Sequence, residues 1–421
     1  MSANIQPAPY TCPACGLLCD DITPSNNTCA KSIAFFGQKL GDATPKIKGQ
    51  TVGLLEAITA AAQILKSSQK PLFAGLSTDI VGFKALENLA QKTGGALTHM
   101  NAQSMARNLK VLQSSGWQTT TLTEVKNRAD LIVCIGSNII DHNPRFFERF
   151  VDVEGMFAGG KISNREIVFL GEKSSHVKID ALNTSWILAH RADALPSVLS
   201  ALHALMLGKP LKVDEIGGIE RADLEALALK LKAAKYAALT WVAKDLDFNH
   251  AELTIEQITQ IVATLNQSDS NHYGRAACLP LGGSDGDTSA NNIHTWRNGI
   301  ILDDATEANN HAPIHDTIIW VNSFSLEKLP PKTDFPLIVL GNANTQFAQI
   351  PAVFIPIATP GLDCNGTLFR VDGSVILPLK KVRDTHLQNQ NLPTLSEIVR
   401  QIENALFNIN QVNTNQEWLP N

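Results

Sequence analysis

Residues 130–137 read DLIVCIGS and residues 166–172 read EIVFLGE, and these two stretches decide the fold class. Each holds a continuous apolar run that ends in glycine followed by a polar residue. A run of this type is typical of a strand buried on both faces, which occurs in parallel sheets covered by helices. The sequence therefore predicts an α/β protein built on parallel strands.

Further strands and helices alternate around these two stretches. Helical spacing of apolar residues predicts helices at 51–68, 80–92, 105–114, 196–207, 222–233, 254–265 and 394–408. Short apolar runs predict strands at 71–76, 96–99, 236–242, 276–280, 317–322, 336–340 and 353–356. Strands that alternate with helices of roughly 10–15 residues indicate parallel pairing, with helices on both faces of the sheet.

The chain of 421 residues is expected to form three domains. Residues 1–50 lack hydrophobic periodicity and predict a small, loop-rich module that holds a cysteine cluster and needs something other than a core to order it. Residues 51–175 predict a Rossmann-like α/β domain. Residues 176–421 predict a second α/β domain with return strands and a C-terminal helix.

Composition and charge exclude several classes of protein. The 35 basic residues are outnumbered by 40 acidic ones, and no basic run appears, which argues against a nucleic-acid or anionic-membrane partner. No stretch approaches the ~18 apolar residues of a membrane span, and the first ten residues do not resemble a signal peptide. We therefore expect a cytoplasmic protein.

Four of the seven cysteines fall close together, with the spacing C-x2-C-x3-C-x9-C: Cys12, Cys15, Cys19 and Cys29. Such clustering in a cytoplasmic protein favours metal ligation over a disulfide framework. Soft thiolate ligands select iron–sulfur clusters or zinc, and the short spacings fit an iron–sulfur cluster better than a zinc ribbon. Thiols that bind no metal are the third interpretation, and all three stay open.

Small polar residues follow two of the predicted strands. Gly136-Ser137-Asn138 ends the strand at 130–137, and residues 341–344 (GNAN) follow the strand at 336–340. Ligands of open α/β sheets bind outside the carboxyl ends of the strands, so either turn can approach a nucleotide or pterin phosphate. The alternative is an ordinary polar strand end, which is common in α/β proteins.

Residues 282–286 (GGSDG) match the pattern G-x-S-x-G of a nucleophile elbow. A P-loop is excluded because no Lys-Ser or Lys-Thr follows. An elbow needs a helix directly after the serine, and the residues from Asp287 to Asn292 are poor helix formers. We therefore expect a surface turn, with no nucleophilic role for Ser284.

Several motifs resemble the B subunit of formylmethanofuran dehydrogenase. They are residues 12–22 (CPACGLLCDDI), residues 123–133 (TEVKNRADLIV) with Gly136–Asn138 and His142-x-Pro144-Arg145, residues 289–292 (SANN) with Thr295-Trp296, and the late run Pro360-Gly361, Gly366-Thr367 and Arg370-x-Asp372-Gly373. The motifs follow the same order as in that family and span nearly the whole chain.

The resemblance implies a molybdopterin-oxidoreductase-like α/β fold (formate dehydrogenase/DMSO reductase type, domains 1–3) that lacks the terminal pterin-binding barrel. The archaeal B subunit carries a four-iron cluster and a tungsten or molybdenum bis-pterin, and it reduces carbon dioxide to formate. A homologous subunit of methylotrophic bacteria belongs to the formyltransferase/hydrolase complex. That complex passes a formyl group from tetrahydromethanopterin to a methanofuran-type carrier and hydrolyses it to formate, with its chemistry in other subunits.

Departures from the redox-active family decide between these branches. The family's metal-binding cysteine or selenocysteine aligns with Ser104, and no cysteine occurs between Ala30 and Val133. A serine hydroxyl is a much weaker ligand than a thiolate at neutral pH. The loop from Cys19 to Cys29 is shorter than in redox-active relatives, and residues 168–175 (VFLGEKSS) lack the Asp-Pro-Arg that those relatives place near the pterin.

The resemblance therefore implies a non-redox, structural subunit, most like its counterpart in the bacterial complex. Its expected partners are the other subunits and a polyglutamylated methanofuran-type carrier. We expect no molybdopterin or tungstopterin, and we assign no catalytic or cofactor-binding residue. Two alternatives remain: a molybdenum or tungsten catalytic subunit with a [4Fe-4S] cluster and Ser104 on the metal, and an assembly module in which zinc staples the four clustered cysteines.

Overall fold

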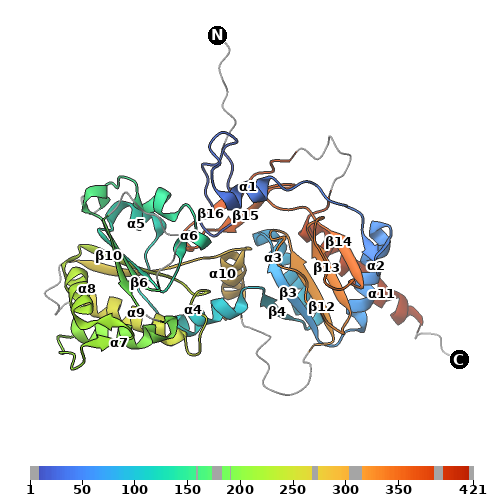
Figure 1. The fold of residues 1–421 in the computed structure, drawn as a ribbon. Coiled ribbons are helices and arrows are strands. Elements are labelled where there is room, and N and C mark those ends of the chain that lie inside the picture. The colour runs from blue at the N-terminus through green and yellow to red at the C-terminus, as the bar shows by residue number, and fades with distance from the viewer. Residues whose placement is uncertain are drawn as a thin grey trace, which may run out of the picture. The chain divides into compact units, whose positions relative to one another are not determined.

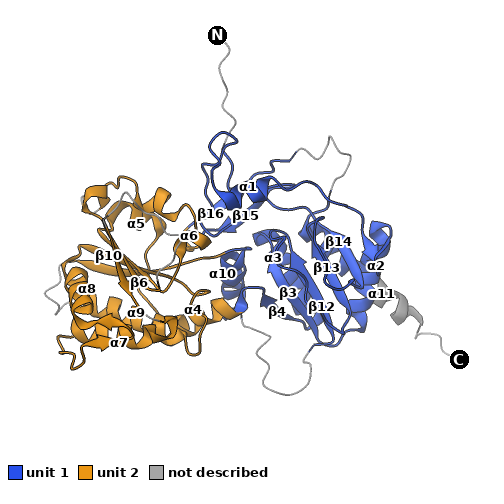
Figure 2. Ribbon diagram, in the orientation of Figure 1, with its two compact units in different colours: residues 1–102, 284–370, 375–421 blue, residues 103–283, 371–374 orange. Residues whose placement is uncertain are grey.

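A computed structural model describes residues 9–157, 160–172, 183–189, 191–267, 274–302, 315–383 and 392–416 (Figure 1). The chain forms two compact units (Figure 2). Unit 1 comprises Met1–Ala102, Ser284–Arg370 and Val375–Asn421, and unit 2 comprises Gln103–Gly283 and Val371–Ser374. Both units are assembled from separate stretches of sequence, whereas the expected domains 1–50, 51–175 and 176–421 are continuous stretches, and that division stays a prediction.

Unit 1 is built on a seven-stranded sheet with the order β2-β1-β14-β13-β12-β3-β4. The strands are β1 (Lys46–Ile47), β2 (Gln50–Thr51), β3 (Pro71–Ser77), β4 (Ala96–His99), β12 (Thr317–Asn322), β13 (Leu337–Gly341) and β14 (Val353–Pro356). Neighbouring strands are parallel from β14 to β4, whereas β1 pairs antiparallel with both β14 and β2. The chain returns at β12 on the side of β3 opposite β4, so the strand order reverses between β3 and β12.

Five helices and a small hairpin complete the described part of unit 1. They are α1 (Ala30–Phe36), α2 (Leu54–Ser67), α3 (Ile80–Thr93), α10 (Asp287–Asn298), α11 (Leu395–Gln416), β15 (Gly366–Phe369) and β16 (Ile376–Leu379). Apolar residues of α2, α3 and α11 form one buried cluster with the strands, including Ile58, Phe83 and Ile398. The Asp79 carboxylate caps α3 by accepting a hydrogen bond from the Gly82 amide at 2.9 Å.

Unit 2 is built on a five-stranded sheet with the order β11-β10-β5-β6-β7, and every neighbouring pair is parallel. The strands are β5 (Leu131–Ile135), β6 (Glu166–Gly171), β7 (Asn183–Leu188), β10 (Tyr236–Val242) and β11 (Arg275–Leu281). The strand order reverses between β5 and β10. The two stretches that decided the fold class are β5 and β6, at the centre of this sheet.

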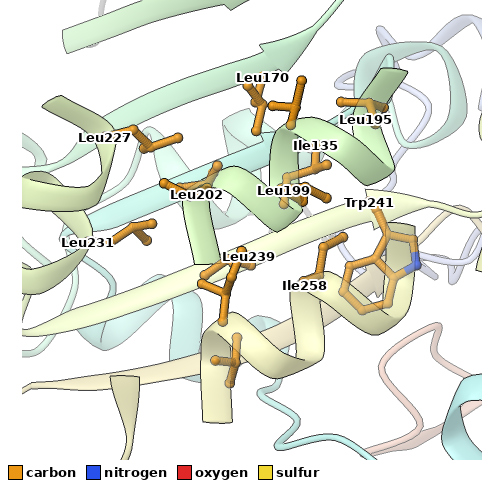
Figure 3. Packing of buried hydrophobic residues seen from close by; sticks show 14 of the residues in the cluster. Ile135, Leu170, Leu195, Leu199, Leu202, Leu227, Leu231, Leu239, Trp241 and Ile258 are labelled. Atoms are coloured by element: carbon orange, nitrogen blue, oxygen red, sulfur yellow. The ribbon is translucent and has the colours of Figure 1, made fainter. Parts of the chain in front are cut away.

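One face of this sheet is covered by α7 (Leu195–Met206), α8 (Arg221–Ala233) and α9 (Glu252–Leu265). Figure 3 shows Leu202 of α7, Leu231 of α8 and Ile258 of α9 turned towards strand residues that include Ile135 and Leu239. Unit 2 also contains the short elements α5 (Leu122–Arg128), α6 (Ile139–His142), η1 (Phe147–Val151), η3 (Ile162–Asn164), η4 (Ala192–Ala194), β8 (Glu215–Ile216) and β9 (Ile219–Glu220). Helix α4 (Ala102–Ser114) begins at the last residue of unit 1's first segment.

The predicted mixture of helices and parallel strands is confirmed, and two local expectations are wrong. Residues 282–286 lie in a loop, but the residues from Asp287 onward, from which no helix was expected, form α10. The Asp287 carboxylate accepts hydrogen bonds from the amides of Ser284 (3.1 Å) and Thr288 (2.6 Å), and Ala290 and Ile293 bury the helix against the core. No described helix has the length and apolar character needed to cross a bilayer.

The cysteine-containing segment is the second expectation that the structure corrects. Its residues do have a core, because Leu18 and Phe35 belong to a buried cluster with later residues of unit 1: Phe324, Leu362, Leu368 and Leu379. The sequence could not reveal this cluster, since the partners lie about three hundred residues further along the chain.

Candidate functional site

Three of the four clustered cysteines, Cys12, Cys15 and Cys19, lie in a tight loop of unit 1. The Cys12 amide donates a hydrogen bond to the Cys19 carbonyl (2.9 Å), and the Leu18 amide donates to the Cys15 carbonyl (3.3 Å). Cys12, Cys15 and Cys19 are buried, and Cys29 occupies the N-cap position of α1. All seven cysteines lie in described segments, and no disulfide joins any of them.

As placed, these thiols do not form a ready metal site. No group of three or more His, Cys, Asp or Glu side chains among the described residues is arranged to hold a metal ion. Burial raises the pKa of the Cys12 thiol to about 12, although a hydrogen bond with Ser32 opposes the shift. Metal binding by the four cysteines stays a prediction, and we derive no chemistry through it.

A pocket of about 270 Å³ lies at the carboxyl ends of β5, β6 and β7, where the sequence placed Gly136-Ser137-Asn138. All of its described lining residues belong to unit 2. Besides these three residues, the lining includes the carboxylates of Glu172 and Asp245. The structure therefore brings the predicted strand end together with two acidic side chains that follow other strands.

The polar groups at this edge are already bonded to one another. Asp245 accepts a hydrogen bond from the Asn138 amide at 3.0 Å through one carboxylate oxygen, and its other oxygen lies 2.6 Å from Nε2 of His142. Glu172 accepts a hydrogen bond from the Ala192 amide at 2.9 Å. Carboxylates thus occupy backbone donors that could otherwise bind an anion.

The floor of the pocket is a row of three side chains, two of which are aromatic. Cys134, Phe169 and Trp186 occupy neighbouring positions in the register of β5, β6 and β7. Alternate residues of these strands face the helical core, so this row faces the other side of the sheet. The Phe169 and Trp186 rings stack, with their centroids 4.3 Å apart and an interplanar angle of 13°. Burial raises the pKa of the Cys134 thiol far above its ordinary value, so the thiol stays protonated at neutral pH.

Two glycines let β5 and β6 end side by side. The Gly136 amide donates a hydrogen bond to the Leu170 carbonyl at 2.8 Å. A Cβ atom on Gly171 would lie 3.0 Å from the Gly136 Cα atom, and Gly171 has a φ of +144°. These glycines therefore serve the close approach of two strand ends.

The second predicted strand end has a structural use in unit 1. The Asn342 side chain donates hydrogen bonds to Thr359 Oγ1 (2.8 Å) and Gln38 Oε1 (3.1 Å), and the Asn344 side chain donates to the Lys39 carbonyl (2.7 Å). The loop 341–344 thus ties down the segment that follows α1. This arrangement supports the interpretation as a polar strand end over a ligand role.

Ser284 and Asp285 of the G-x-S-x-G loop lie in a polar cluster of unit 1. The Ser284 hydroxyl donates a hydrogen bond to the Asp285 carboxylate at 2.8 Å, and the Lys328 ammonium donates to the same oxygen at 2.7 Å. His99 cannot act as a base here, because its Nδ1 accepts from the Asn101 amide (3.0 Å) and its Nε2 contacts the Asp285 carbonyl (3.2 Å). Burial also lowers the pKa of His99. Among the described residues, the Ser284 hydroxyl is therefore held by the Asp285 carboxylate and not by a histidine, and the expected lack of a nucleophilic role stays a prediction.

Ser104, which aligns with the family's metal ligand, lies in the first turn of α4. The sequence did not single out Glu172, Asp245 or Trp186 as members of a site. A signal for Asp245 existed, because it follows the apolar run of a parallel strand as Asn138 does, but nothing in the sequence shows that their two strands are neighbours.

Curated relatives match most of the chain. It is 26% identical over 413 residues to the B subunit of tungsten-containing formylmethanofuran dehydrogenase 2 from Methanocaldococcus jannaschii, in an alignment that covers 89% of this chain and 93% of the relative. It is 25% identical over 411 residues to the protein of the same description from Methanococcus maripaludis (88% and 92%). It is 24% identical over 358 residues to the Fhc B subunit of the formyltransferase/hydrolase complex from Methylorubrum extorquens (78% and 89%). No family model matches the chain.

A solved structure shares the fold. It is a chain in the crystal structure of the formyltransferase/hydrolase complex (FhcABCD) from Methylorubrum extorquens in complex with methylofuran, with a TM-score of 0.69 and 21% identity, covering 87% of this chain and 99% of that chain. The resemblance inferred from the motifs is confirmed: this chain is a homologue of the B subunits of formylmethanofuran dehydrogenase and of the Fhc complex.

Proposed function

We propose that this chain is a non-redox, structural subunit of a formyltransferase/hydrolase complex in tetrahydromethanopterin- and methanofuran-linked one-carbon metabolism. Its partners are the other subunits of that complex and a polyglutamylated carrier of the methanofuran type. The relatives support this proposal, since they are named as B subunits of formylmethanofuran dehydrogenases and of a formyltransferase/hydrolase complex, and they match the chain over most of its length.

One observation carries the non-redox role. The chain keeps the family's motifs in order, yet it has no cysteine between Ala30 and Val133, the segment in which the redox-active family supplies a cysteine or selenocysteine to its metal. Ser104 at the aligned position offers only a hydroxyl, which holds a soft metal much more weakly than a thiolate does. The loss of this ligand favours a subunit whose remaining role is assembly.

The finer fold assignment belongs to the same proposal. Two parallel sheets, each with a point where the strand order reverses, support a molybdopterin-oxidoreductase-like architecture without the terminal barrel.

Purification of the native complex under anaerobic conditions tests the proposal. We expect the chain to co-purify with transferase and hydrolase subunits and to contain no stoichiometric tungsten or molybdenum. Isolation as a lone monomer contradicts the assembly role. Stoichiometric tungsten or molybdenum, together with oxidation of formate by an artificial electron acceptor, contradicts the non-redox role and supports the catalytic alternative.

The same sample decides the prediction about the four clustered cysteines. About four iron atoms per chain support a [4Fe-4S] cluster, and about one zinc supports the zinc-stapled module. A Cys12→Ser/Cys15→Ser double variant should then lose the metal, whereas the control Cys364→Ser should keep it. A sample with neither metal contradicts the prediction of a metal site.

A further inference from the structure

We propose that the pocket of unit 2 binds a small, flat organic cation of the amidinium or guanidinium class and rejects phosphate esters. This inference concerns the isolated chain, and it does not depend on assembly with other subunits. The glycine-containing strand end suggests a phosphate from sequence, but the groups that line the pocket have the opposite charge preference.

Three of the backbone amides that line the pocket already have hydrogen-bond acceptors within the protein. The amides of Gly136, Asn138 and Ala192 donate to the Leu170 carbonyl, to Asp245 and to Glu172. No lysine or arginine is among the described residues that line the pocket. Phosphate groups at strand ends are held by backbone amides or by cationic side chains. A phosphate here would instead face carboxylates, so the residues present do not fit a phosphate-bearing pterin.

The same groups suit a cation that donates hydrogen bonds. Glu172 uses one oxygen on the Ala192 amide, which leaves carboxylate lone pairs for a planar N–H donor. Asp245 adds a second negative charge at the same edge of the sheet. Paired N–H groups on a flat, delocalised cation match the planar geometry of a carboxylate better than a compact ammonium group does.

The floor of the pocket favours a flat ligand. Trp186 lines the pocket, is only partly buried, and is held in place by its stack on the buried Phe169 ring. Cations bind favourably over the face of a tryptophan ring, and more strongly where water is excluded. A volume of about 270 Å³ holds a ligand with one small ring system.

Three probes of similar shape and different charge test the proposal on the full chain: benzamidinium, benzamide and phenyl phosphate. Ligand-observed NMR and tryptophan fluorescence measure their binding. We expect saturable binding of benzamidinium, weaker binding of benzamide and no saturable binding of phenyl phosphate. Glu172→Gln should weaken benzamidinium binding about two- to fivefold, which is the size of one ion pair at an exposed carboxylate. Trp186→Leu should weaken it through the loss of the ring face.

The matched control is Glu56→Gln, which removes an exposed carboxylate from the first turn of α2 in unit 1 and should leave the affinity unchanged. Far-UV circular dichroism shows whether each variant is folded. Because Glu172 is exposed, Glu172→Gln is expected to fold. Phenyl phosphate that binds as tightly as benzamidinium overturns the proposal. It is also overturned if benzamidinium shows no saturable binding, or if its affinity is the same in wild type, Glu172→Gln and Trp186→Leu.

Discussion

The side chain of Arg165 is the clearest target for a stability measurement in unit 2. It is 1% exposed, and every hydrogen bond that its guanidinium donates to the described residues goes to a backbone carbonyl. Nε donates to Ala129 at 3.2 Å and Nη1 donates to Val153 at 2.8 Å, while further bonds reach Val151 and Lys126. Burial lowers the pKa of Arg165, and these carbonyls compensate the buried charge.

Replacement of Arg165 by methionine keeps an unbranched apolar stem and removes the guanidinium group with every donor. Two of the four bonds, to Ala129 and Val151, are buried, and each buried acceptor left without a partner costs about 1–3 kcal/mol. The two partly buried carbonyls regain water at a smaller cost. We therefore expect Arg165→Met to lower the free energy of unfolding of unit 2 by about 3–5 kcal/mol, and the midpoint of its thermal transition by roughly 10 °C.

Urea denaturation followed by fluorescence and circular dichroism measures this loss, and hydrogen exchange of β5 and β6 assigns it to unit 2. The control is Arg128→Met, which removes an exposed ion pair with Glu124 (2.8 Å) and a contact over the Phe157 ring (4.2 Å), and should cost about 1 kcal/mol or less. Arg165→Lys should recover only part of the stability, because one ammonium group cannot reproduce the planar fork of donors. If the free energies of unfolding of Arg165→Met and Arg128→Met differ by less than about 1 kcal/mol, the reasoning about buried acceptors is refuted.

Three further changes test other parts of the structure. Glu87, a fully buried carboxylate of α3, accepts hydrogen bonds from three side chains of α10. Glu87→Gln should therefore lower the free energy of unfolding, measured by urea denaturation, by about 2–4 kcal/mol. A decrease no larger than that caused by Glu56→Gln contradicts this role. Gly286 has a φ of +76°, and a Cβ atom there would lie 2.3 Å from the Thr78 carbonyl, so Gly286→Ala should cost about 3 kcal/mol or more, and an unchanged thermal midpoint contradicts the close approach. Burial raises the pKa of Cys278 from 9.0 to about 12, so the unfolded chain loses this proton first and the stabilising effect of the buried thiol falls as pH rises from about 9 to 12. Between about pH 8 and about pH 10, the free energy of unfolding of the wild type should fall by about 1.4 kcal/mol relative to that of Cys278→Ala, as measured by urea denaturation. If the two free energies change with pH in parallel, the raised pKa is contradicted.

The sequence predicted which segments form strands better than it predicted which strands pair with each other. Short apolar runs such as residues 131–135 and 236–242 could be predicted as strands, because both faces of each strand are buried. Nothing in either run shows that β5 pairs with β10 across about a hundred residues, or that β3 pairs with β12. Pairing depends on packing between distant segments, which local patterns do not encode.

The candidate site shows the same limit. Ser137 and Asn138 could be predicted at a strand end because they follow a buried strand directly. The acidic character of the pocket comes from Glu172 and Asp245, which follow two other strands, so it emerges only once the strand order is known. Helix α10 was missed for a related reason: its polar sequence has weak intrinsic preference for a helix, and burial of Ala290 and Ile293 supplies the stability.

The placement of unit 2 inside the sequence of unit 1 has a consequence during translation. β4 ends at His99, and β12, which pairs with β3, begins only at Thr317, about 220 residues later. At roughly 5–20 residues per second, the ribosome needs on the order of 10–40 seconds to deliver β12. During that interval, the nascent β3 lacks the neighbour that covers one of its edges, and all five strands of unit 2 are synthesised before β12 is. Unit 2 can thus fold first. The unpaired edge of β3 in the incomplete sheet of unit 1 is the surface that a chaperone or a partner chain can protect during this interval.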